Sequence, residues 1–150
     1  MKKVLPYNYD ALIESECWTY HRCAIIQAYP NLMSWFTDHL NCLTMNNKYE
    51  CDFGDYGKRY NVINYYDSVL TTTEINIEEH DENDMLKFIK HCIDMDKYII
   101  IDIDCTQVYD SITEPFVGEL LIYGYSDEKN CLYTPSILMN GTIEEKICFN

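Results

Sequence analysis

The sequence is poor in basic residues. Eleven lysines and arginines stand against 25 aspartates and glutamates, and the formal net charge at pH 7 is −14. Nucleic acids and anionic membranes would be repelled by this charge, so neither is expected as a partner. The charge is compatible with a cationic or amine-bearing ligand, and equally with a charge that only keeps the chain soluble.

Long apolar runs are also missing. No stretch approaches the ~20 apolar residues of a membrane-spanning helix. The opening Met1–Leu5 resembles the start of a signal peptide, but Pro6 and Asp10 end its apolar run at once. The sequence therefore predicts a cytoplasmic protein.

Metal-binding cysteine patterns are absent too. The chain has eight cysteines, yet no C-x-x-C and no cysteine–histidine cluster with zinc-finger spacing. In a reducing cytosol these cysteines are expected to be thiols rather than a disulfide framework. We expect neither a metal nor a cofactor.

What is present indicates one α+β domain. The 150 residues suffice for one core, and the 47% apolar content argues against disorder. We expect helices over 11–29, 32–40 and 82–95, the last with Asp81 as N-cap and with Met85, Phe88, Ile89 and Cys92 on its buried face. A loop is predicted over 46–60. Strands are predicted over 62–66, 69–77, 98–103, 119–125 and 131–134, with 98–103 central in a mostly antiparallel sheet.

The end of the sequence predicts one more helix. Thr142 and Glu145 have the spacing of a capping box. Only five residues follow, and a helix that short is marginal alone. Either it packs on the domain, or the natural polypeptide continues and residues 1–150 are its N-terminal domain.

Cys17 is the candidate nucleophile, because it lies early in the first helical pattern, where helix N-termini stabilise a thiolate. The alternative is a buried, inert thiol. A base is also required. His21 lies one turn after Cys17, while His80 follows a predicted strand between acidic neighbours that would raise its pKa.

Two carboxylates alternate with isoleucines at the end of strand 98–103. Asp102 and Asp104 are therefore expected on one face of that strand. They could hold a metal, orient a base or cap a loop. The polar turn over 126–130 is expected to carry only solvated charges.

Two stretches carry a resemblance to a known family. They read Tyr-Ile-Ile-Ile-Asp-Ile-Asp at 98–104 and Glu-Leu-Leu-Ile-Tyr-Gly-Tyr at 119–125, after a Tyr-x-Tyr-Asp at 7–10 and Cys17. In these stretches the chain resembles the family around butirosin biosynthesis protein H and the cysteine-protease-like ligase of closthioamide synthesis. The resemblance implies a papain-like fold, with N-terminal helices packed on the sheet.

The resemblance also implies an activity and its residues. Such proteins use a Cys-His-Asp triad to move an acyl or peptidyl group from a carrier-protein thioester to an amine. Cys17 matches the nucleophile, and Asp102 and Asp104 match the acidic strand. The family's histidine position is Gly118 here, and the last acid is replaced at Ser136.

Three hypotheses follow. The first is a cysteine-dependent transferase that forms an amide between a carrier-bound acyl group and a small amine in natural-product biosynthesis. The second is a catalytically degenerate homologue that acts as a binding or assembly partner, in a homo- or hetero-oligomer. The third is a scaffold domain whose function lies in a longer polypeptide.

Overall fold

The computed structural model describes residues 1–11, 17–39, 44–45, 51–52, 66–75, 82–107, 113–137, 143–144 and 147–148. The chain divides into two compact units, and each is described by itself. One unit combines Met1–Pro6 with Asn76–Asn150, and the other is Tyr7–Ile75. Helices and antiparallel strands together make the architecture α+β, as the sequence predicts.

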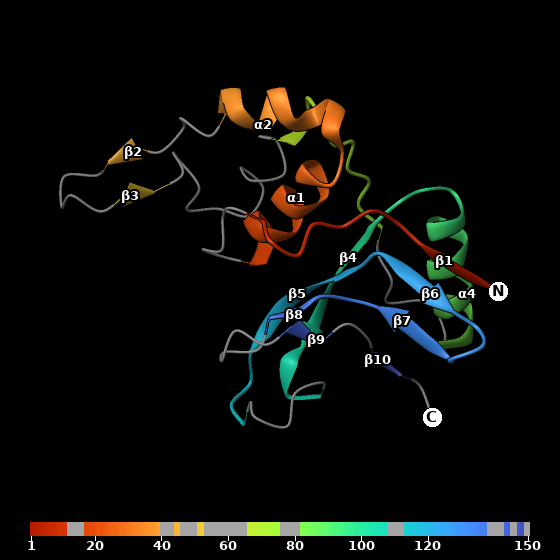
Figure 1. The fold of residues 1–150 in the computed structure, drawn as a ribbon. Coiled ribbons are helices and arrows are strands. Elements are labelled where there is room, and N and C mark those ends of the chain that lie inside the picture. The colour runs from red at the N-terminus through yellow and green to blue at the C-terminus, as the bar shows by residue number, and fades with distance from the viewer. Residues whose placement is uncertain are drawn as a thin grey trace. The chain divides into compact units, whose positions relative to one another are not determined.

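The first unit is built on a four-stranded antiparallel sheet (Figure 1). Its strand order is β1 (Lys2–Val4), β6 (Gly124–Ser126), β7 (Cys131–Tyr133) and β10 (Ile147–Cys148). The chain enters β6 directly from β5 (Val117–Ile122), and β5 pairs along its whole length with β4 (Ile99–Asp104). The strands predicted over 98–103 and 131–134 are thus confirmed, whereas the one predicted over 119–125 is divided at Tyr123 into β5 and β6, which lie in different sheets.

Close approach of β1 to β6 depends on Gly124. A β-carbon at this position would lie 2.7 Å from the carbonyl oxygen of Lys3 and 2.9 Å from the Cα of Val4. Both atoms belong to the backbone, which cannot move aside without breaking the pairing. The Leu5 amide extends the contact by donating to the Tyr123 carbonyl at 2.7 Å. The beginning of the chain is thereby fixed to a strand more than a hundred residues later.

Helix α4 (Glu82–Asp94) forms the core of this unit with the strands. Ile93 is 0% exposed, whereas Phe88, predicted on the buried face, is 36% exposed. The buried side chains of the core cluster are Leu5, Ile89, Ile93, Ile122, Tyr125 and Leu132. Two residues after the helix, Asp96 is in the left-handed conformation (φ 59°), and the Lys97 amide donates back to the Cys92 carbonyl. Asp81, its predicted N-cap, lies outside the described residues.

Helices form about half of the described part of the second unit. It contains α1 (Cys17–Gln27), the 3₁₀ helix η1 (Pro30–Leu32) and α2 (Met33–His39). Tyr29 is extended between α1 and η1, which confirms the predicted break. The helices share a cluster of Cys23, Ile26, Phe36 and Tyr66. Two short strands, β2 (Thr44–Met45) and β3 (Cys51–Asp52), pair with each other, so a strand lies where the sequence predicts only loop.

The strand predicted over 69–77 is wrong for its described part. The amides of Val69 and Leu70 both donate to the Tyr66 carbonyl, as in a helical turn, and residues 71–75 are exposed. Consecutive Val69 and Leu70 pack against one cluster, which a flat strand would not allow because neighbouring side chains point to opposite faces. Residues 62–65 and 76–77 lie outside the described part of the chain.

The helix predicted after Thr142 is wrong as well. Ile143–Glu144 forms β9, which pairs with β8 (Ser136–Ile137), and β10 pairs with β7. A helix of only a few residues is marginally stable, because it forms few backbone hydrogen bonds. Pairing with another strand gives the same backbone groups hydrogen-bond partners. The prediction that strand 98–103 is central in the sheet is also wrong for the described strands, because β4 pairs with β5 alone. The isoleucines of β4 are accordingly half-buried.

Candidate functional site

Helix α1 carries the candidate nucleophile and one candidate base. Cys17 is its first residue, and His21 follows one turn later, so the two positions share a helix face. Every residue from Tyr20 to Ile26 is buried, and His21 is 2% exposed. Its ring meets that of Tyr20 edge-on, with centroids 6.0 Å apart. The His21 ring is therefore surrounded by other side chains and shielded from solvent.

Sequence reasoning missed Arg22. It is 6% exposed, next to His21, although arginines are almost never fully buried unless paired. It is one of two arginines in a strongly acidic sequence, and this rarity inside an apolar helix pattern was the available signal. Its charge reaches Cys23, where it acts to lower the pKa of the thiol.

Cys23 nevertheless remains a protonated thiol. Burial raises its pKa, and this outweighs the opposing effects of the Tyr66 hydroxyl and Arg22. Its sulfur lies 3.4 Å from the Tyr66 hydroxyl. Because the thiolate is the nucleophilic form, Cys23 is a packing residue and no competitor to Cys17.

The β4–β5 ribbon carries the two candidate carboxylates. Asp102 and Asp104 are both exposed, on the same face, as the alternating pattern predicts. The register places Glu119 of β5 directly opposite Asp102.

Asp104 serves the loop that follows β4. Its Oδ1 accepts hydrogen bonds from the Thr106 amide at 3.0 Å and the Thr106 hydroxyl at 2.7 Å. These bonds start the 3₁₀ helix η3 (Cys105–Gln107). Loop capping is one of the three roles that the sequence leaves open for the carboxylate pair, and Asp104 has it.

Gly118 lies opposite Ile103 in the same ribbon. A β-carbon at Gly118 would lie 2.9 Å from the Sγ of Cys105 and 3.3 Å from the ring of Phe116. Cys105 is buried, and its amide donates to the Phe116 carbonyl at 2.8 Å. A side chain at Gly118 would therefore require the Cys105 thiol to shift from its present position.

The predicted site residues are distributed over both units. Cys17 and His21 belong to the Tyr7–Ile75 unit, while Asp102, Asp104 and Gly118 belong to the other. His80 lies outside the described residues. In the Tyr7–Ile75 unit, Cys17 and His21 lie one turn apart on α1. In the other unit, Asp102 lies opposite Glu119 in the β4–β5 ribbon.

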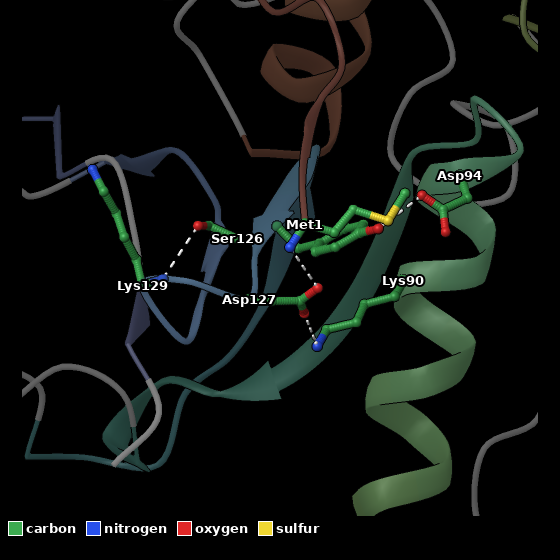
Figure 2. A network of polar contacts seen from close by, with 7 residues as sticks. Met1, Lys90, Asp94, Ser126, Asp127 and Lys129 are labelled. Carbon is green, nitrogen blue, oxygen red and sulfur yellow. Dashed lines mark hydrogen bonds and ion pairs between the residues drawn. The ribbon is translucent and has the colours of Figure 1, made fainter.

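A polar network surrounds the turn after β6 (Figure 2). The Lys90 Nζ lies 2.6 Å from Asp127 Oδ1, and the Met1 amino group lies 3.2 Å from Oδ2. Hydrogen bonds from Lys90 and the amino group hold the pKa of Asp127 below its usual value. The expectation that this turn carries only solvated charges is wrong for Asp127, because β1 and α4, distant in sequence, bring cations to it.

Tyr125 joins α4 to the sheet beneath this network. Its hydroxyl donates to Asp94 Oδ1 at 2.9 Å, and the Lys90 Nζ lies 5.6 Å from its ring centroid. Burial and the neighbouring Asp94 raise the pKa of the Tyr125 hydroxyl. The network is thus an anchor for the turn and the helix rather than a reactive centre.

Metal ligation and membrane crossing can be checked over the same residues. In the described ranges, no group of three histidine, cysteine, aspartate or glutamate side chains could hold a metal ion. Nor does any helix found there have the length and apolar character needed to cross a membrane.

Comparison with known proteins gives no relative. No family model matches the chain, and no curated protein or solved structure matches it significantly. What the chain does is therefore inferred from its own residues.

Proposed function

We propose that this chain is a catalytically degenerate papain-like protein that acts as a binding or assembly partner. The packing around Gly118 carries the proposal. The resemblance gives this position to the catalytic histidine, yet a β-carbon would meet the Cys105 sulfur at 2.9 Å. A cysteine nucleophile needs a base that it can reach, and the position meant for that base is packed for glycine.

The acidic positions support the same proposal. Asp104 accepts two hydrogen bonds from Thr106 and so serves a loop. Ser136, where the resemblance expects the last acid, begins β8. Two of the three triad positions therefore lack the family's residue, and one acid of the matching strand is engaged in a cap.

Charge indicates the kind of partner. With a net charge of −14, the chain favours a basic or amine-bearing partner over an acidic one. Carrier proteins are commonly acidic, so charge would not assist their docking. The proposed setting is the cytoplasm, where cysteines are ordinarily kept as thiols.

The second candidate is amide formation by Cys17, with an acyl or peptidyl carrier protein as donor and a small amine as acceptor. The position of His21 favours it, because a buried imidazole lies one helical turn from Cys17. The thiol of Cys17 would attack the thioester carbonyl and release the carrier thiol. The amine would then attack the acyl-enzyme and regenerate Cys17.

One experiment separates the two. The protein is incubated with several acyl thioesters and its intact mass is measured, beside Cys17→Ala and, as a control for general thiol acylation, Cys92→Ala. The binding proposal expects no adduct that depends on Cys17. An adduct that vanishes in Cys17→Ala, persists in Cys92→Ala and forms far more slowly in His21→Gln establishes the transferase instead.

A binding measurement tests the positive half of the proposal. Calorimetry with spermidine as the amine probe is run at low salt and at about 0.15 M salt, where exposed charges are largely screened beyond ~8 Å. A saturable site at the higher salt is expected. Heat that disappears with screening would mean that the amine meets only a diffuse acidic surface, and the partner assignment would fail.

A further inference from the structure

Two cysteines lie opposite one another on neighbouring strands. Cys131 begins β7, Cys148 ends β10, and the antiparallel register pairs them directly. Among the strand registers described, this one alone sets cysteine against cysteine. Opposite Cα atoms in antiparallel pairs are about 4.5 or 5.5 Å apart, and both values fall in the ~4.4–6.8 Å range of disulfides.

We propose that Cys131 and Cys148 are a site of reversible oxidation, where a cross-strand disulfide fastens β10 to the sheet. The bond would join the edge strand to β7, which already pairs with β6 on its other side. The site is separate from the residues on which the proposed function depends. It adds a covalent state that responds to the thiol–disulfide balance around the protein.

The surroundings of Cys131 can accept the bond. Leu132, the next residue of β7, packs in the core with Ile89 and Ile93 of α4. Because successive strand residues point to opposite faces, Cys131 lies on the sheet face away from that core. Ser126, its other cross-strand neighbour, is buried there with it. A disulfide on this face leaves the packing of α4 undisturbed.

The reaction needs a small disulfide as oxidant, such as glutathione disulfide. The thiolate of one cysteine attacks a glutathione sulfur, forms a mixed disulfide and releases one glutathione thiolate. The thiolate of the second cysteine then attacks the protein sulfur of that mixed disulfide and releases the second glutathione. The two cysteine protons end on the two glutathione thiols, so two cysteines are oxidised and one disulfide is reduced.

Access follows from the place of β10 in the sheet. It is a two-residue strand at the sheet edge, the kind of element that opens at low free energy. Once formed, the bond closes the chain between residues 131 and 148. Closing this loop restricts the unfolded chain, so the oxidised protein is expected to be the more stable form.

Trypsin makes the bond directly visible. Cleavage after Lys129 and Lys146 puts Cys131 in the peptide 130–146 and Cys148 in the peptide 147–150. The native protein is equilibrated in glutathione buffers of graded oxidation, quenched with acid, alkylated while denatured and digested. We expect these two peptides to be linked. The equilibrium constant for forming the disulfide with glutathione should be at least about tenfold higher in the native protein than in the same chain unfolded in guanidinium.

Variants complete the test. Cys131→Ser and Cys148→Ser should each abolish the linked peptide, whereas Cys92→Ser on α4 should leave it unchanged. The midpoint of thermal unfolding should rise by several degrees on oxidation of the wild type and Cys92→Ser, and should not rise in Cys148→Ser, which retains the buried Cys131. Linkage no more frequent than that of other cysteine pairs, or glutathione retained separately on each cysteine, overturns the proposal.

Discussion

Lys90 on α4 holds Asp127 in the turn between β6 and β7, with its Nζ 2.6 Å from Oδ1 (Figure 2). The Met1 amino group approaches the other carboxylate oxygen at 3.2 Å. A single carboxylate thus links three segments that are distant in the sequence: the first strand, helix α4 and a hairpin turn. The link has a direct consequence for stability as a function of pH.

Stability should fall in acid through Asp127. Its folded-state pKa lies below the ordinary value of 3.8, so its stabilising effect is present above that value and is lost as the pH falls through the folded pKa. Asp127→Asn should lower the melting temperature at pH 7 and have a smaller effect well below pH 3.8, as the wild-type carboxyl becomes protonated. Glu128→Gln in the same turn is the matched control. An equal loss at both pH values would contradict the assignment.

Tyr125 should make the protein sensitive to alkali. Its folded-state pKa is raised, so the contribution is complete below the unfolded pKa of about 10 and is lost as the pH rises through the folded value. Tyr125→Phe should remove this alkaline loss and, at neutral pH, cost about 1 kcal/mol for the hydrogen bond to Asp94. Urea unfolding at neutral and alkaline pH measures both. If the variant and the wild type lose stability in parallel above pH ~10, another group is responsible.

The contact between Cys105 and Gly118 predicts a coupled pair of substitutions. Gly118→Ala should destabilise the protein by about 1–3 kcal/mol, because its β-carbon would meet the Cys105 sulfur at 2.9 Å. In a Cys105→Ala background the sulfur is gone, so the same change should cost measurably less. Urea unfolding of the four proteins gives the coupling energy. Additive effects would mean that the sulfur is not what excludes a side chain at position 118.

Helix α4 should show which of its faces is buried. Ile93→Ala should cost about 2–5 kcal/mol, because Ile93 is 0% exposed in the core cluster. Phe88→Ala, at a position 36% exposed, should cost less than about 1 kcal/mol. Chemical denaturation of the two variants decides the matter. A larger loss for Phe88→Ala would place the sequence-derived face, rather than the structural one, against the sheet.

The sequence by itself determined the α+β fold class and the positions of helices α1, α2 and α4 and of strands β4 to β7. The alternation and β-branched residues of 98–104 and 119–125 predict strands, the spacing from Glu82 predicts α4, and Pro30 marks the end of α1, all of which the structure contains. These features arise from local periodicity and local steric restriction, which a short window of sequence carries. The same local reasoning placed Asp102 and Asp104 on one face of their strand, while the exposure of that face is a finding of the structure.

Only the tertiary structure decided what each element meets. The segment after Thr142 has a helical start signal, yet its residues lie in strands because sheet edges were available to pair with them. Asp127 is ion-paired because β1 and α4 meet at its turn. The space beside Gly118 is filled by Cys105, thirteen positions earlier. In each case the deciding partner is remote in the sequence, and no local pattern records which remote segment the folded chain brings into contact.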